Sequence, residues 1–205
     1  LFYITDIGLG HLLKGLGLIE RTIFDPKTMI TNHLDAEIYA SYGFHALGIS
    51  NEITLKDYKA ILEKTNIKAF YQVFGYRLMF TSRRKLVSLY SEKIQKSIAL
   101  DNLSIEEATR LREERYPIYE DQYGTKIYRN HLICLLKEII DLPMEYAFLD
   151  DMLISSDIFK EIISLFHSAI ERRDISSLLE RLDQLKLPIS DGFSYKDSVY
   201  MKEEF

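Results

Sequence analysis

Apolar and polar positions follow two alternating periods along the first ninety residues. Short apolar runs rich in β-branched and aromatic residues predict strands, and apolar residues at every third or fourth position predict helices. The predicted strands cover residues 1–4, 28–30, 46–49 and 69–73. Because strand and helix alternate over short connections, the pattern indicates parallel strands joined by right-handed crossovers, as in an α/β barrel or an open sheet.

Each helix predicted in this part of the chain begins after a side chain suited to an N-cap position. These residues are Asp6, Asn32, Thr54 and Ser82. The helix after Asn32 is expected to run to about residue 42 and to bury Leu34, Ile38 and either Tyr39 or Tyr42. The helix after Thr54 is expected to bury one apolar face that includes Tyr58.

Residues 69–86 combine a buried strand, a glycine and a cationic turn. Gly75 is expected to turn the chain, and Ser82 to lie near the cap of the next helix. Residues 83–85 (Arg-Arg-Lys) would then occupy its first turn, where cations oppose the helix dipole unless an acid or an anion is present. A ligand site after the strand is one interpretation. A solvated basic turn is the other.

The alternation stops after residue 90. The charged segment 91–114 predicts an exposed connector, with a helix that starts at Ser104. Residues 115–128 alternate around Gly124 and predict a β-hairpin, whose first strand is expected to be an edge because it contains Pro117.

The last third of the chain returns to apolar segments. An apolar helix at residues 132–140 is expected to contain Cys134, and a buried strand at 147–149 is followed by two amphipathic helices. The predicted divisions are 1–90 (barrel units), 91–114 (connector), 115–187 (hairpin, further barrel units and helices) and 188–205 (tail).

Composition narrows the class of protein. The chain has 205 residues, is 47% apolar and carries a formal net charge of -5, so we expect a packed core and no broad nonspecific binding to nucleic acid. One cysteine suits a reducing cytoplasm, and no apolar run approaches a membrane span. The chain begins inside an apolar run at Leu1, which we interpret as the start of a fragment in mid-strand.

Polar residues at predicted strand ends are the first candidates for chemistry. Asn32, Glu52 and Asp150 follow predicted strands, where they serve either as ligands or as helix caps. No Gly-x-Ser-x-Gly or His-Glu-x-x-His motif is present, and the five histidines show no ligand spacing. No metal site is therefore predicted.

Four stretches together resemble one family, the collagenase-like peptidases of family U32. They are residues 48–52 (Gly-Ile-Ser-Asn-Glu), 73–84 (Val-Phe-Gly to Ser-Arg-Arg), 115–134, and the pair 148–150 (Phe-Leu-Asp) and 191–193 (Asp-Gly-Phe). The resemblance implies a partial (β/α) TIM-like barrel in an α/β fold. It would lack the first strand–helix units and carry an added β-hairpin and C-terminal helices.

The resemblance also implies a function. The family is named for peptidase activity, and its similar members are linked to hydroxylation of RNA, including the wobble uridine of transfer RNA, with prephenate as a co-substrate. Those members often hold an iron–sulfur cluster on four cysteines. Here Leu78 and Lys85 stand at two of the cysteine positions, and only Cys134 matches a third. Phe74 and Asn51 replace the family's His and Arg.

These departures predict that the chain holds no cluster of its own. They suit the shorter paralogue of Gram-positive bacteria, which would act beside a full-length paralogue. We therefore expect a cytoplasmic protein that works in transfer-RNA hydroxylation. Its expected partners are the paralogue and transfer RNA, without membrane contact. The sequence leaves open whether the chain forms oligomers. The candidate site residues are Glu52 and Asp150 as catalytic groups and Arg84, Arg83, Asn32 and Ser82 as substrate-binding groups. We expect Glu52, Arg84 and Asp150 to converge on one pocket, where Arg84 would hold an anionic small molecule. A collagenase-like protease and a noncatalytic module that uses the hairpin are the alternatives.

Overall fold

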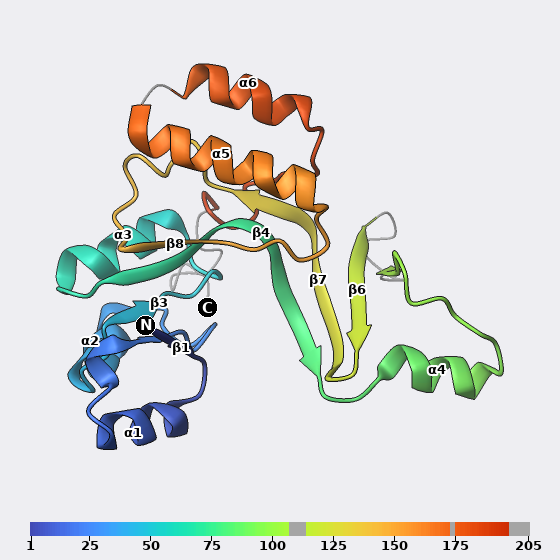
Figure 1. Cartoon of the computed structure of the whole chain (residues 1–205), viewed down its shortest axis with the longest axis horizontal. Helices are drawn as coiled ribbons and strands as arrows, with labels where there is room; N and C mark the ends of the chain where they lie inside the picture. Colours follow the sequence, from blue (N-terminus) through green and yellow to red (C-terminus); the bar gives the residue numbers. More distant parts are fainter. Residues whose placement is uncertain (107–113, 173–174, 197–205) are drawn as a thin grey trace, which may run out of the picture. The chain divides into compact units, whose positions relative to one another are not determined.

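The computed structural model describes residues 1–106, 114–172 and 175–196 and has a mixed α/β fold (Figure 1). The chain forms two compact units. Unit 1 comprises the described residues among 1–74, 134–186 and 191–205, and unit 2 comprises those among 75–133 and 187–190. The division at residues 90 and 115 stays a prediction.

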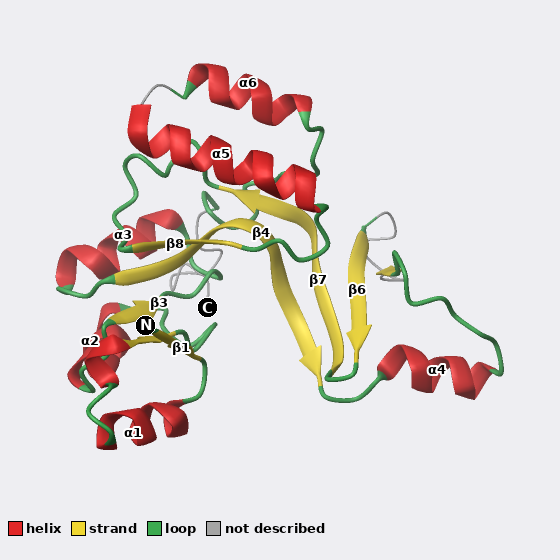
Figure 2. Cartoon of the chain, in the orientation of Figure 1, coloured by secondary structure: helices red, strands yellow, loops and turns green. Residues whose placement is uncertain are grey.

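Unit 1 contains a parallel sheet in the order β1-β2-β3-β4-β8. Its strands are β1 (Phe2–Ile4), β2 (Thr22–Phe24), β3 (Ala46–Gly48), the first half of β4 (Ala69–Ser82) and β8 (Tyr146–Leu149). Helices alternate with the first four strands (Figure 2). The predicted parallel pairing is confirmed. Within the described chain β1 pairs only with β2 and β8 only with β4, so a closed barrel stays a proposal.

The helices of unit 1 begin where the sequence predicts them. They are α1 (Ile7–Gly15), α2 (His33–Ser41), α3 (Leu55–Lys64), α5 (Ser156–Arg172) and α6 (Ser176–Gln184). The predicted caps of the first three are confirmed. The side chains of Asp6, Asn32 and Thr54 each accept a hydrogen bond from the backbone N–H three residues on, at 2.9–3.0 Å.

Aromatic side chains fill much of the core of unit 1. Tyr58 of α3 packs against Tyr71 of β4 with ring centroids 4.4 Å apart, and its hydroxyl donates to the carbonyl of Pro143 at 2.6 Å. Phe74 contacts Phe166 of α5 edge-on at 6.3 Å. Each such ring, fully buried, contributes about 1.5–3 kcal/mol relative to exposure.

Two details of the first ninety residues differ from expectation. The predicted strand at 28–30 is wrong, because β2 lies six residues earlier and Lys27 turns the chain with a left-handed φ of 62°. The predicted burial of Leu34 and Ile38 is also wrong, since each is 60% exposed. α2 packs through the buried Ala36 and through Tyr39, whose ring lies 5.2 Å from that of Phe24.

The chain does not turn at Gly75, contrary to prediction. β4 continues through this residue for 14 residues in all, and Gly75 has a φ of 120°, which a residue with a side chain rarely adopts. The register with β8 shifts between Gln72 and Phe74, just before this point. β4 thereby passes from unit 1 into unit 2 as one strand.

The described residues of unit 2 form antiparallel strands and one helix. Its elements are the second half of β4, α4 (Leu86–Ile94), β5 (Ser104–Glu106), β6 (Arg115–Asp121) and β7 (Gly124–Cys134). The predicted hairpin is confirmed, with Ile118 opposite Ile127 and Asp121 opposite Gly124.

Three predictions for this region are wrong. Pro117 does not mark an edge strand, because β6 also pairs with β5, where Ser104 lies opposite Pro117. A proline is tolerated there because only alternate residues of an antiparallel pair donate a backbone N–H to a given neighbouring strand. Cys134 ends a strand rather than lying in a helix, since a short apolar run fits either structure. Ser104 is in β5, and the predicted helix beyond it falls on residues 107–113, outside the described residues.

Glu120 of β6 is the acidic group that lies at the start of α4. α4 begins at Leu86, so residues 83–85 precede the helix, and Ser82 Oγ accepts from the N–H of Arg84 rather than from an amide of the helix. The Glu120 carboxylate, 7% exposed, accepts from the N–H groups of Val87 and Ser88 at 2.8 and 3.1 Å. The expected Ser82 cap is therefore replaced by a carboxylate from a distant strand.

Several donors converge on this carboxylate. The hydroxyls of Ser88 and Thr125 reach Glu120 as well, and Thr125 Oγ1 also accepts from the N–H of Leu86 at 2.9 Å. Burial by itself raises the pKa of Glu120, but the hydrogen bonds from Ser88, Thr125 and the two backbone amides outweigh it, so the pKa is lowered.

Replacing Glu120 with Gln tests this cap. The substitution removes the charge and turns an amide NH₂ toward N–H donors, so the free energy of unfolding at pH 7 should fall by about 1–3 kcal/mol. Because the folded-state pKa is lowered, the carboxylate's contribution is present above its ordinary value near 4.5 and is lost as pH falls through the lowered pKa. Urea denaturation across this pH range measures both effects.

Glu106→Gln is the matched control, since Glu106 forms an exposed ion pair with Arg115. Its effect should stay within about 0.5 kcal/mol. Equal stabilities for the two variants, or a Glu120 effect that grows in acid, would contradict the cap.

Candidate functional site

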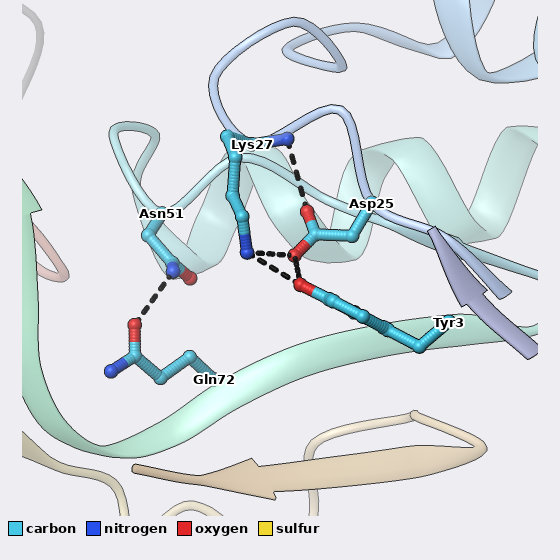
Figure 3. Close-up of polar contacts among 5 residues, drawn as sticks. All are labelled: Tyr3, Asp25, Lys27, Asn51 and Gln72. Atoms are coloured by element: carbon cyan, nitrogen blue, oxygen red, sulfur yellow. Dashed lines mark hydrogen bonds and ion pairs between the residues drawn. The ribbon is translucent and has the colours of Figure 1, made fainter. Parts of the chain in front are cut away.

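A polar cluster lies at the carboxyl ends of the parallel strands of unit 1 (Figure 3). Tyr3 comes from β1, Asp25 and Lys27 follow β2, Asn51 follows β3, and Gln72 lies in β4. In parallel α/β sheets this edge is where ligands bind, because loops and helix starts gather there. We call these five residues the strand-end cluster.

Three members of the strand-end cluster share one proton network. The Tyr3 hydroxyl donates to Asp25 Oδ2 at 2.6 Å, and Lys27 Nζ donates to the same oxygen at 2.6 Å and to the Tyr3 hydroxyl at 2.5 Å. The N–H of Lys27 donates to Asp25 Oδ1 at 3.0 Å and closes a turn around Pro26. Both carboxylate oxygens of Asp25 are therefore occupied.

The charges within this network follow from its surroundings. Burial raises the pKa of Tyr3, and the hydrogen bond to Asp25 raises it further, more than Lys27 lowers it. Burial lowers the pKa of Lys27, but its bonds to Asp25 and Tyr3 outweigh that loss, so the pKa is raised. At neutral pH Tyr3 is therefore a neutral phenol and Lys27 an ammonium.

Lys27 is the accessible end of this network. Its side chain is 53% exposed, whereas the side chain of Asp25 is only 10% exposed. An ammonium ion presented in this way can donate a charge-assisted hydrogen bond to an anionic oxygen while Asp25 holds it in place.

The other half of the strand-end cluster is neutral. Asn51 Nδ2 donates to Gln72 Oε1 at 3.0 Å, and Gln72 Nε2 donates to the carbonyl of Phe74 at 3.4 Å. Gln72 is buried and Asn51 is half-buried. These amides add donors and acceptors for an oxygen-rich ligand without adding charge.

Gly48 at the end of β3 allows the strands to approach at this point. A Cβ atom on Gly48 would lie 2.4 Å from Asp25 Oδ1, so any larger residue would displace the carboxylate. The close approach of backbone to a functional carboxylate is a position where only glycine fits.

The predicted site residues lie in both units. Glu52 is exposed after β3, and its N–H donates to Ser50 Oγ at 3.1 Å. Asp150 follows β8, half-buried, and accepts from the N–H of Met152 at 3.0 Å, while Asn32 caps α2.

Ser82, Arg83 and Arg84 belong to unit 2, and both arginines are exposed. Because Glu52 and Asp150 belong to unit 1, the convergence of Arg84 with these two acids stays a prediction. The same holds for the substrate-binding and catalytic roles assigned to all six residues.

Sequence reasoning missed Tyr3, Asp25, Lys27 and Gln72. Asp25 and Lys27 were missed because the second strand was predicted too late in the chain. Residues 22–25 (Thr-Ile-Phe-Asp) form a strand followed by an acid, and this pattern is recognised only if the strand is assumed to end before Pro26. Gln72 was passed over as an interior residue of a strand. Tyr3 looked like one more apolar position of the first strand.

A separate groove of about 610 Å³ lies elsewhere in unit 1. Its lining includes Lys56 and Lys59 of α3, Lys137 and Glu138 after β7, and Tyr195. None of the strand-end cluster residues lines it. Acidic and basic side chains alternate around this groove, so it shows no preference for one sign of charge.

Cys134 is a protonated thiol. Burial raises its pKa to about 11, and the nearby Glu138 adds to the shift against a backbone hydrogen bond that lowers it. Among the residues that the structure describes, no three histidine, cysteine or acidic side chains come together as metal ligands. No described helix is both long enough and apolar enough to cross a bilayer.

A family model and one curated relative match the chain. Residues 1–187 match the model of peptidase family U32. The tRNA hydroxylation protein P2 of Bacillus subtilis (strain 168) is 24% identical over 193 residues, covering 85% of this chain and 62% of that protein. The chain thus spans about three-fifths of the length of this relative. No solved structure matches the chain.

Asp25→Asn tests whether the strand-end cluster depends on its buried carboxylate. The amide keeps the shape but presents a donor to Lys27 Nζ or to the Tyr3 hydroxyl, so the free energy of unfolding should fall by about 1–3 kcal/mol. Urea denaturation of Glu145→Gln provides the control, because Glu145 forms an exposed pair with Lys68. That variant should be nearly neutral; a similar loss in both would remove any special role for Asp25.

Cys134 offers a second test, because it is the only thiol in the chain. With a pKa of about 11, its alkylation by iodoacetamide at pH 8 should be roughly 10²-fold slower than that of an ordinary cysteine. The rate should keep rising tenfold per pH unit beyond pH 8. The same chain in urea is the control, and equal rates in the folded and unfolded states would contradict the shift.

Proposed function

Because the chain belongs to peptidase family U32, and is similar to a tRNA hydroxylation protein, we propose that it acts in hydroxylation of the wobble uridine of transfer RNA. The observation that carries the proposal is the strand-end cluster, where a carboxylate holds an exposed ammonium at the carboxyl ends of parallel strands. This edge is the usual position of an α/β active site. In this proposal the strands belong to a TIM-like barrel.

The chemistry of the cluster suits a small anionic co-substrate such as prephenate. Lys27 would bind a carboxylate of the ligand, and the amides of Asn51 and Gln72 would bind its neutral oxygens. Glu52 and Asp150 follow β3 and β8, so they reach the same end of the sheet and are proposed as polar or base groups. Asp25 orients Lys27 and does not contact the ligand.

The residues present do not fit an iron–sulfur cluster held within this chain. Such a cluster needs four cysteines, and the chain has Cys134 alone, with a raised pKa that opposes the thiolate form. We propose that the chain contributes as a partner subunit and that a cysteine-bearing paralogue supplies any cluster. Cleavage of protein substrates is the alternative, and it would need a nucleophile activated by a neighbouring base.

Lys27→Met should abolish the proposed activity. In cells that lack the gene, the variant should restore less than a tenth of the hydroxylated wobble uridine that the wild type restores, measured by mass spectrometry of digested transfer RNA. Lys27→Arg should restore part of it, because the charge is kept. The purified wild type should also show a prephenate-dependent rise in Tm that Lys27→Met lacks.

Lys68→Met is the matched control for this experiment. The Lys68 side chain is 52% exposed and pairs with Glu145, so it resembles Lys27 in exposure and in having an acidic partner. Full modification with Lys27→Met would refute the proposal. Cleavage of gelatin by the purified protein, abolished by Glu52→Gln or Asp150→Asn, would favour the protease alternative.

A further inference from the structure

The charges of this chain are unevenly divided along the sequence. Residues 75–133 contain eleven Lys and Arg against eight Asp and Glu, whereas the whole chain contains 26 against 31. The segment that forms nearly all of unit 2 is thus basic within an acidic protein. A local excess of positive charge of this kind marks a surface that can approach phosphates when the remainder of the protein repels them.

Two loops of unit 2 meet at one end of its strands. The connection from β4 to α4 and the turn from β6 to β7 lie side by side (Figure 1). A Cβ on Gly124 would lie 1.9 Å from the carbonyl oxygen of Ser82, and Thr125 Oγ1 accepts from the N–H of Leu86 at 2.9 Å. The turn therefore holds residues 83–85 in place through their backbone.

The side chains at this end project into solvent. Arg83, Arg84 and Lys85 are all exposed, and within the described part of the chain none of the three forms an ion pair. Tyr123, in the adjoining turn, is 74% exposed, the highest value among the large apolar side chains of the described residues. We call these four residues the basic tip.

A small anion is a poor occupant for the basic tip. The N–H groups at the start of α4, which would otherwise bind one, already donate to Glu120 and Thr125. What remains is a row of three cations beside an aromatic ring. Neighbouring phosphates of a nucleic-acid backbone can bind the three cations, and an unpaired base can stack on the ring of Tyr123.

We propose that the basic tip binds the backbone of RNA and that Tyr123 stacks on an unpaired base. The identity of this RNA as transfer RNA rests on the proposed function. The assignment moves Arg83 and Arg84 from a co-substrate site, where sequence reasoning put them, to contacts with a polynucleotide. It gives the two units different tasks, since the strand-end cluster lies in unit 1 and the basic tip in unit 2.

Fluorescence anisotropy with labelled transfer RNA tests the proposal on the full chain. A variant with Arg83, Arg84 and Lys85 all changed to Ser should bind at least tenfold more weakly at about 0.1 M salt. The slope of log K against log salt should become shallower by about three, one for each phosphate that the variant no longer binds. The variant with Lys56, Lys59 and Lys137 changed to Ser removes the same charge from exposed positions of unit 1 and should retain the wild-type slope.

Charge-conserving and aromatic variants separate binding from folding. The double variant Arg83→Lys with Arg84→Lys keeps the charge and should keep the wild-type slope of log K against log salt. This variant tests the proposal even if the triple Ser variant does not fold. Tyr123→Ala should weaken binding of a single-stranded loop RNA roughly tenfold. Tyr195→Ala, which removes a 58% exposed ring from unit 1, should not.

Several outcomes would overturn the inference. They are wild-type affinity and slope in the triple Ser variant, no RNA binding by the wild type, or loss only of binding to a protein paralogue. Lys27→Met separates this inference from the proposed function, because it should bind RNA normally. If tip variants lose RNA binding while no hydroxylation depends on the protein, RNA binding stands and the proposed function fails.

Discussion

The fold depends on one long strand, β4, which belongs to both units. β4 belongs to the parallel sheet of unit 1 through its first residues and to the antiparallel strands of unit 2 through its last, and it crosses between them at Gly75. A φ of 120° is accessible to glycine and strained for other residues. If the chain turned at this glycine, unit 2 would lose its first strand, and the second half of β4 could not pair with β7.

Two buried carboxylates show different ways to hold a negative charge out of water. Asp25 is neutralised by a side-chain ammonium and a phenol, so the cation it holds stays available to solvent. Glu120 is stabilised by backbone amides and hydroxyls, so it holds no side-chain cation in place. The first arrangement can present a cation to a ligand, whereas the second is complete without one.

Local signals in the sequence predicted local features well. The caps at Asp6, Asn32 and Thr54 and the hairpin around Gly124 depend on residues close in the chain, and all were found. Short apolar runs were less informative. β2 was displaced and the strand that ends at Cys134 was taken for a helix, because three to nine apolar residues fit more than one element.

The pattern of apolar and polar positions could not predict contacts between residues far apart in the sequence. Glu120 caps a helix that begins 34 positions earlier, at Leu86, and Tyr3 meets Asp25 across 22 positions. The sequence showed that a cationic first turn would oppose the helix dipole, but it could not show that residues 83–85 precede the helix or which of many acids caps it. Glu52, flagged because it follows a strand, proved to be exposed, while its neighbour Asn51 contacts Gln72.

This contrast bears on how relatives of this chain can be compared. The relative is 24% identical, a level at which single charged residues change often without loss of fold, so motif matches alone assign roles poorly. Contacts are a firmer guide, because Asp25 constrains Gly48, Lys27 and Tyr3 at once. A substitution at one of these positions requires compensation at another. If the cluster serves the proposed reaction, the four should change together among relatives, while residues 83–85 need only conserve their charge.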